Sequence, residues 1–323
     1  MKVLITGGAG FLGQKLARAL LARGTLSGAD GIQQKIDQLV LADVVQAHDF
    51  GDPRVRVVTG DITDARVMRS LIDADTASVF HLAAVVSGQA EADFDLGMQI
   101  NLDASRLLLE TCRAAGHKPR VVFTSSVAVY GGTLPDVVTD ATALNPQSSY
   151  GAQKAIGELL LNDFSRKGFV DGRVLRLPTI SVRPGKPNKA ASSFASGIIR
   201  EPLAGIAAIC PVSPALRLWL LSPRRAIAAL IAGHELSGTA LGTSRTINLP
   251  GLSVSVAEMV AALEKVAGPE VAARISYAPD PAVERIVQSW PGAWDDSRAR
   301  SLGLEGDADF ESVIRAHIED EPE

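Results

Sequence analysis

A glycine-rich turn close to the start of this chain limits its fold more than any other feature. The segment KVLIT (2–6) predicts a buried strand, and the sequence GGAGFLG (7–13) follows it and opens a helical pattern. Glycines at this spacing allow a tight turn, close approach of a phosphate to the backbone, and close packing of helix on strand. The helix N-terminus then presents free N–H groups to the phosphates. The turn therefore predicts a dinucleotide site that includes Gly7, Gly10, Phe11, Leu12 and Gly13.

Strand-like and helical segments alternate after this turn. Further strands are expected at 38–43, 55–61, 77–84, 120–126 and 172–178. Helices are expected at 14–24, 65–74, 95–116 and 149–168. Because the strands are apolar on both faces, they predict a parallel sheet with helices on either side. Right-handed crossovers then favour a doubly wound α/β sheet, the Rossmann fold.

The alternation ends after Pro178. Residues 178–197 are rich in Pro, Gly, Ser and Lys and predict a functional loop rather than a strand. A helix at about 222–234 and a strand at 245–250 are expected to return to the main sheet. We therefore expect an NAD-binding Rossmann domain at 1–178, to which 222–248 returns. A smaller C-terminal substrate-binding lobe is expected to comprise 179–221 and 249–323.

Composition excludes several other classes of protein. The formal net charge is −4 and no run of Lys and Arg occurs, so no nucleic-acid partner is expected. The two cysteines, Cys112 and Cys210, are far apart, which predicts no metal site. No apolar stretch approaches the ~20 residues needed to span a membrane. The first apolar run is too short for a signal peptide, so a cytoplasmic location is expected.

An acid closes the second strand of the predicted sheet. Asp43 can accept hydrogen bonds from the adenosine ribose, and its charge would repel a 2′-phosphate. It lies farther from Gly13 than the ~20 residues expected, and the excess falls in an apparent surface insertion at 25–38. Val44 rather than an arginine follows it, so NAD is favoured over NADP as cofactor. The alternative is that Asp43 only caps the loop that follows.

Tyr150 and Lys154 form a Tyr-x-x-x-Lys pair on a predicted helix, where an i, i+4 spacing places both on one face. An ammonium beside a phenol is expected to lower the pKa of the phenol from ~10 and to allow general acid–base catalysis. The strand 120–126 ends in Ser126, at the sheet edge where open parallel sheets bind ligands. A serine there can hold a substrate oxygen for the tyrosine.

Four motifs carry a family resemblance: TGGAGFLG (6–13), HLAA (81–84), TSSVAVYGG (124–132) and YGAQK (150–154). In this order and spacing they resemble the extended short-chain dehydrogenase/reductases. The resemblance implies Ser126 as catalytic serine, Tyr150 as proton donor and acceptor, and Lys154 as a ligand of the nicotinamide ribose. It also implies a homodimer, formed through helices 95–116 and 150–168. Further cofactor-site residues implied by the resemblance are Asp61, Ile62, Leu82, Ala83, Ala84, Asn101, Pro178 and Ile180.

Residues 83–101, 175–203 and 217–224 resemble a narrower group, the D-erythronate dehydrogenases of sugar-acid catabolism. That resemblance implies NAD-dependent oxidation of D-erythronate at C2, to 2-dehydro-D-erythronate. A short hydroxy acid needs a cation for its carboxylate and donors for its hydroxyls. We expect Arg183 to bind the carboxylate and Ser87 to line the substrate site, with Arg217 and Arg224 as second choices for the cation. The loop cations could also be solvated surface charges. Other polar candidates in the same loop are Lys186, Asn188, Ser192 and Ser193.

Two other functions stay open from the sequence. A nucleotide-sugar epimerase or dehydratase would share Tyr150 and Lys154 but would need a groove for a second nucleotide. A non-catalytic regulator that senses NAD(P) would share the glycine turn but would not need the tyrosine–lysine pair. Release of NADH on turnover separates these functions, because an epimerase recycles it and a sensor produces none.

Overall fold

A single parallel sheet organises the larger part of the molecule, which we describe from a computed structural model. Within the described residues, 1–28 and 30–321, the sheet has seven strands in the order β12–β8–β7–β6–β1–β4–β5. Every pairing in it is parallel. The predicted doubly wound α/β sheet is therefore confirmed. The strands are β1 (Lys2–Thr6), β4 (Gln38–Asp43), β5 (Val55–Thr59), β6 (Thr76–His81), β7 (Arg120–Ser126), β8 (Asp171–Leu177) and β12 (Thr246–Asn248).

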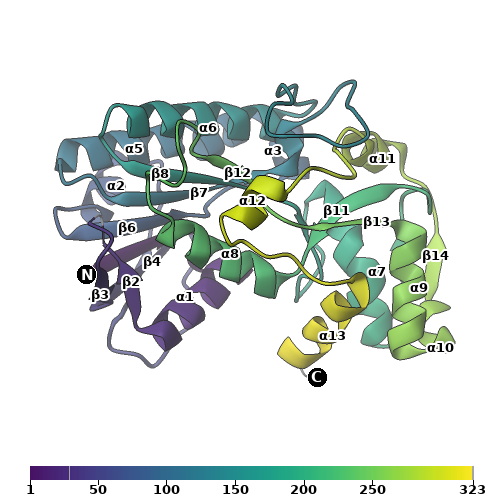
Figure 1. Cartoon of the computed structure of the whole chain (residues 1–323). Coiled ribbons are helices and arrows are strands. Elements are labelled where there is room, and N and C mark those ends of the chain that lie inside the picture. The colour runs from purple at the N-terminus through teal and green to yellow at the C-terminus, as the bar shows by residue number, and fades with distance from the viewer. Residues whose placement is uncertain (29, 322–323) are drawn as a thin grey trace.

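Helices cover both faces of this sheet because its strands are apolar on both sides. In β1, Val3 and Ile5 point into one core and Leu4 into the other. The first core lies under α1 (Phe11–Arg23) and α8 (Pro223–Glu235). On the opposite face, at the top of Figure 1, lie α2 (Ala65–Leu71), α5 (Ala104–Ala115) and α6 (Ser149–Arg166). No helix among the described residues is long and apolar enough to cross a membrane.

The helix expected at 95–116 is broken in the structure. It consists of α4 (Phe94–Gly97), a π-helical turn, η1 (Met98–Asp103), and then α5. One extra residue in a turn hardly changes the spacing of apolar side chains, so periodicity could not reveal it. The expected insertion at 25–38 contains a short hairpin of β2 (Thr25–Ser27) and β3 (Gln33–Lys35).

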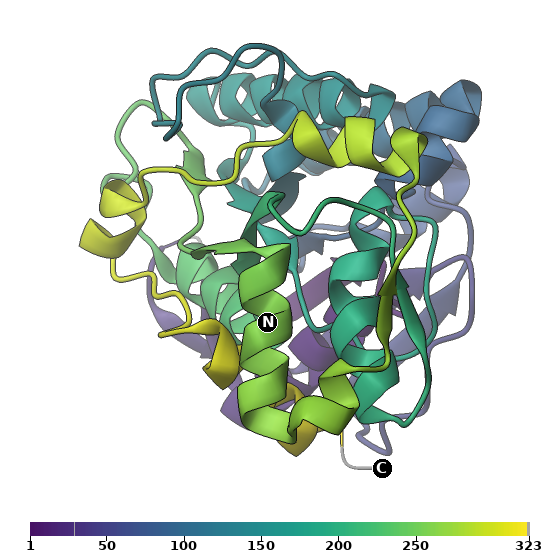
Figure 2. The same ribbon diagram turned by 90° about the vertical axis from the view of Figure 1, so that its right-hand side faces the viewer.

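The remaining elements form a smaller lobe, seen on the right of Figure 1 and facing the viewer in Figure 2. The loop expected at 178–197 is only partly a loop, because it contains a strand and the start of α7 (Phe194–Leu203). Phe194, Ile198 and Ile199 are buried in the core of the lobe, and this burial outweighs the polar composition of the segment. The strands are β9 (Thr179–Ile180), β10 (Ala208–Cys210), β11 (Arg217–Leu221), β13 (Leu252–Ser255) and β14 (Ile275–Tyr277). Two other helices, α3 (Ser87–Ala92) and α12 (Ser297–Ser301), lie beside the sheet, and α12 contacts β12. The helices of the lobe besides α7 are α9 (Val256–Ala267), α10 (Pro269–Ala272), α11 (Pro281–Gln288) and α13 (Phe310–Asp320).

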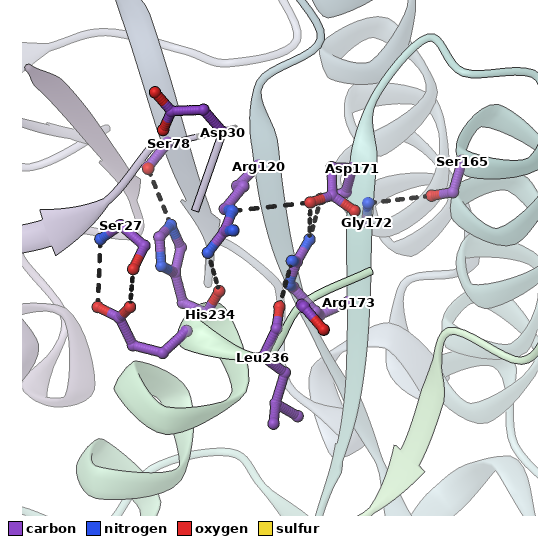
Figure 3. A network of polar contacts seen from close by, with 12 residues as sticks. Ser27, Asp30, Ser78, Arg120, Ser165, Asp171, Gly172, Arg173, His234 and Leu236 are labelled. Atoms are coloured by element: carbon purple, nitrogen blue, oxygen red, sulfur yellow. Dashed lines mark hydrogen bonds and ion pairs between the residues drawn. The ribbon is translucent and has the colours of Figure 1, made fainter. Parts of the chain in front are cut away.

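A buried polar network fixes the C-terminus of α8 to the amino ends of β7 and β8 (Figure 3). Arg120 donates to the carbonyl of His234 at 2.9 Å, and Arg173 donates to that of Leu236 at 2.5 Å. The last carbonyls of a helix lack intrahelical partners and carry partial negative charge, so buried guanidinium groups are well placed there. Asp171 pairs with Arg173 at 2.8 Å and lies 3.6 Å from Arg120. The network lies at the sheet edge opposite to the candidate site.

Candidate active site

One cavity at the carboxyl ends of β1, β6, β7 and β8 brings together most of the predicted site residues. It lies where the chain connections leave β1 and β6 in opposite directions, the place where doubly wound sheets bind ligands. The residues predicted to bind the cofactor, to catalyse the reaction and to bind the substrate therefore line the same cavity. Those that line the cavity are Gly7, Gly10, Phe11, Leu12, Gly13, Leu82, Ala84, Ser87, Ser126, Tyr150, Lys154, Pro178, Ile180 and Arg183.

The glycine turn has the geometry that a pyrophosphate requires. Gly7 has a φ of +72°, and a Cβ on it would lie 2.8 Å from the backbone nitrogen of Ala83. A Cβ on Gly13 would overlap the carbonyl oxygen of Gly7. Gly10 caps α1 without any side-chain hydrogen bond, so the first N–H groups of the helix stay free beside the cavity. These features fit the diphosphate of a dinucleotide.

Asp43 ends β4 and accepts a hydrogen bond from Ala9 in the glycine turn at 3.0 Å. It also accepts one from Val45 at 3.4 Å, so it does cap the loop that follows, the alternative left open by the sequence. The acid thus lies at the glycine turn, although it does not line the cavity that contains Tyr150 and Lys154. Four other predicted cofactor-site residues also lie outside the lining: Asp61, Ile62, Ala83 and Asn101.

Asn101 supports the wall of the cavity from behind. It is fully buried in η1, accepts from the Val85 nitrogen at 2.9 Å and donates to the Val85 carbonyl at 3.2 Å. It also donates to Gln153 on α6 at 2.8 Å. Its polar atoms are therefore engaged within the protein, and its position joins the segment after β6 to the helix that carries Tyr150 and Lys154.

The structure brings Ser126, Tyr150 and Lys154 together. Ser148 caps α6 by accepting from Gly151 at 3.2 Å, which fixes the first turn of the helix around Tyr150. The Ser126 side chain lies close enough to the Tyr150 phenol to lower its pKa, and both residues line the cavity. The Lys154 ammonium lies 5.7 Å from the centre of the Tyr150 ring, and its side chain is only 2% exposed. This is an arrangement of serine, phenol and ammonium at one end of a cavity.

The expected lowering of the phenol pKa is wrong for this structure. Burial raises the pKa of Tyr150 to about 12, against the opposing effects of Ser126 and of the Arg183 charge. Burial likewise lowers the pKa of Lys154 to about 8, opposed by Glu158. For both pKa values, the loss of hydration on burial has a larger effect than the nearby charges. The positive charge that favours the Tyr150 phenolate is that of Arg183.

Arg183 is the cation best placed to bind an anion in this cavity. Its backbone is held on both sides, since its N–H donates to Ser196 at 3.0 Å and its carbonyl accepts from Arg200 at 2.7 Å. Within the described residues, its buried Nη2 has no hydrogen-bond partner. Arg217 pairs instead with Glu258, and Arg224 with Glu319 and Asp320, and neither lines the cavity.

The loop after β9 contributes fewer polar side chains to the cavity lining than the sequence predicted, and a residue from a later segment of the smaller lobe adds to that lining. Asn188 and Ser192 line the cavity, whereas Lys186 is exposed outside it. The Ser87 hydroxyl accepts from the Ala191 nitrogen at 3.1 Å and so ties α3 to this loop. Sequence reasoning missed Trp290, which also lines the cavity. An isolated tryptophan 140 residues beyond Tyr150 follows no motif that could have indicated it.

Comparisons with known proteins agree with this geometry. Residues 3–216 match the NAD dependent epimerase/dehydratase family. The D-erythronate dehydrogenase of Cupriavidus necator is 68% identical over 99% of this chain and 98% of its own length, and that of Haemophilus influenzae is 49% identical over 99% of each. The crystal structure of the nucleoside-diphosphate-sugar epimerase from Agrobacterium tumefaciens has a TM-score of 0.93 at 44% identity, over 99% of this chain and 94% of that chain. The chain is an oxidoreductase, and it belongs to the NAD dependent epimerase/dehydratase family within the extended short-chain dehydrogenase/reductases.

Proposed function

We propose that this protein is an NAD-dependent dehydrogenase that oxidises the C2 hydroxyl of D-erythronate, a short sugar acid, to 2-dehydro-D-erythronate. One observation carries the proposal: Arg183, whose buried Nη2 has no partner among the described residues, lines the same cavity as Tyr150, and its charge favours the Tyr150 phenolate. In a 2-hydroxy acid the carboxylate is bonded to the carbon that carries the hydroxyl. The cation and the base must therefore be neighbours, as Arg183 and Tyr150 are. The names of the Cupriavidus and Haemophilus relatives support this substrate.

The residues at the glycine turn fit the cofactor. The turn of Gly7, Gly10 and Gly13 would hold its pyrophosphate, and Asp43 would accept from the adenosine ribose. NAD is preferred over NADP because a 2′-phosphate would meet the carboxylate of Asp43. Lys154 would donate to the nicotinamide ribose, since it lines the cavity beside Tyr150. When bound, the nicotinamide supplies the acceptor for the C2 hydride.

The side chains of this chain supply the proton chemistry. Tyr150 takes the proton of the C2 hydroxyl in its phenolate form, which burial opposes and the Arg183 charge favours. Ser126 holds the oxygen of that hydroxyl in place. Loss of this proton together with the C2 hydride leaves the 2-oxo group. Lys154 and Arg183 hold positive charge beside the phenolate, and Arg183 also orients the carboxylate.

NADH absorbance with D-erythronate as substrate tests the proposal. Tyr150→Phe and Ser126→Ala should each reduce kcat about 100-fold or more, because positioned acid–base groups contribute about 10²–10⁴. NAD binding, followed by fluorescence, should persist in both variants. Tyr277→Phe, at an exposed tyrosine of β14, serves as the control and should retain wild-type turnover. Full turnover by Tyr150→Phe would refute this mechanism.

A nucleotide-sugar epimerase is the second candidate, favoured by the name of the Agrobacterium structure. The two activities differ in the fate of the hydride. A dehydrogenase accumulates free NADH with the sugar acid, whereas an epimerase returns the hydride to its sugar and accumulates none. NAD binding without turnover of any sugar acid or nucleotide sugar would indicate a sensor. Cytoplasmic location and the homodimer stay predictions of the sequence resemblance.

A further inference from the structure

Trp290 differs from the other tryptophans of the chain in having an unused hydrogen-bond donor. The indole N–H groups of Trp219 and Trp294 both donate to the Leu249 carbonyl, at 3.3 and 2.7 Å. Within residues 1–28 and 30–321, the buried Nε1 of Trp290 has no partner. Buried indole N–H groups normally find an acceptor, and an unpaired buried donor destabilises a fold. This donor therefore requires an explanation.

The position of Trp290 relates this donor to the substrate. Eight buried side-chain polar atoms lack a partner among the described residues, and of these only Arg183 Nη2 and Trp290 Nε1 belong to residues that line the catalytic cavity. The ring is 9% exposed and packs in the core of the smaller lobe, and the Trp290 backbone N–H donates to Val287 at 3.2 Å. Trp290 thus brings to the cavity lining, from the C-terminal lobe, a donor that has no partner among the described residues.

We propose that the Trp290 indole N–H donates to a hydroxyl of the bound acid at C3 or C4, and that this bond helps the enzyme to select polyhydroxy acids. The inference rests on the proposed function. The cavity offers two unsatisfied donors of different kinds. The guanidinium of Arg183 suits the carboxylate, whereas the neutral indole N–H suits a hydroxyl oxygen. An acid that lacks the partner hydroxyl would leave the indole N–H unpaired and would be oxidised more slowly.

Trp290→Phe tests the inference, because phenylalanine keeps an aromatic ring and loses the donor. Activity is measured as kcat/KM on D-erythronate and on its 3-deoxy and 4-deoxy analogues. On D-erythronate we expect a roughly 2- to 12-fold decrease, the range of one net hydrogen bond. On the analogue that lacks the partner hydroxyl we expect no decrease. Trp219→Phe, which loses an N–H bonded to Leu249, is the matched control and should affect all three acids alike.

Three results would overturn the inference. The first is full activity of Trp290→Phe on D-erythronate, and the second is an equal decrease on all three acids. The third needs no variant and is independent of folding: the wild-type enzyme oxidises both deoxy analogues as fast as D-erythronate. Failure of the proposed function is a separate observation, because the wild-type protein would then form no NADH from any of the acids. That result would also remove the basis of the inference.

Discussion

Glu158 links β7 to α6, the strand and the helix that carry Ser126 and Tyr150, and its replacement should destabilise the protein measurably. It lies on α6, one turn beyond Lys154. Its carboxylate accepts from Ser125 at 2.5 Å and from both Nε and Nη2 of Arg176, at 2.8 and 2.6 Å. The two paired side chains are only 3% and 9% exposed. Ser125 precedes Ser126, so this contact holds the end of β7 against α6.

Glu158→Gln keeps the shape of the side chain but removes the charge that compensates Arg176. Breaking a buried ion pair from one side costs about 3–5 kcal/mol. A chain of 323 residues has an unfolding entropy of about 0.7 kcal/mol/K, from ~2.1 cal/mol/K per residue. The melting temperature should therefore fall by about 4–7 °C. The kcat on D-erythronate should also fall, because Ser126 and Lys154 lose part of their support.

Thermal unfolding followed by circular dichroism measures the effect, and urea unfolding gives the free energy of unfolding. The matched control is Asp163→Asn on the same helix, which breaks the exposed pair with Arg166. Exposed pairs contribute about 0–1 kcal/mol, so the control should change the melting temperature by less than about 2 °C. If Glu158→Gln shifts it no more than Asp163→Asn does, the buried network does not stabilise the site as argued.

Two further predictions concern the cofactor side of the cavity. Lys154→Met should stabilise the fold at pH 7 by on the order of 3 kcal/mol, because burial lowers the lysine pKa from 10.5 to about 8. The unfolded chain keeps the lysine proton up to about pH 10.5, whereas the folded chain loses it near pH 8. The free energy of unfolding of the wild-type protein therefore rises as the pH increases from about 8 to about 10.5. The difference in stability between Lys154→Met and the wild-type protein becomes smaller over the same range. Urea unfolding at pH 7 and pH 10 checks the sign, and an advantage that grows with pH would contradict it. Gly13→Ala should weaken NAD binding tenfold or more, because its Cβ would overlap the Gly7 carbonyl and push α1 from the turn. Fluorescence titration measures the affinity, with Gly197→Ala in α7 as a control whose Cβ meets only the Glu201 side chain.

Features that depend on short stretches of sequence were predictable. The strands of the main sheet, including β12, follow from local apolar runs, and each agrees with its expected position to within a few residues. The placement of Tyr150 and Lys154 on one helix face follows from the helical period alone. The glycine turn was recognisable because its glycines, Gly7 and Gly13, have no room for a side chain.

Errors arose where distant contacts outweigh local composition. The polar segment 178–197 contains the start of α7, because Phe194 and its neighbours reach the core of the smaller lobe. The π-helical turn at Asn101 was missed because it depends on bonds to Val85 and Gln153 as well as on its own sequence. The pKa of Tyr150 is raised rather than lowered, since burial by surrounding elements outweighs the opposing effects of Ser126 and Arg183.

The sequence alone specified the sheet, the phosphate-binding turn and the tyrosine–lysine pair, because each arises from backbone geometry and side-chain spacing within one short segment. It placed Arg183 before Arg217 and Arg224 as the carboxylate ligand, but it could not show which of these arginines are already paired with carboxylates. The tertiary structure distinguishes them by their partners: carboxylates pair with Arg217 and Arg224, whereas Arg183, in the cavity of Tyr150, has one nitrogen without a partner in the described part of the chain. Trp290 enters the same cavity only because the smaller lobe folds against the sheet edge. Packing between distant segments decides which charged groups and donors keep no partner within the described residues, and the proposed substrate side of the cavity rests on this property.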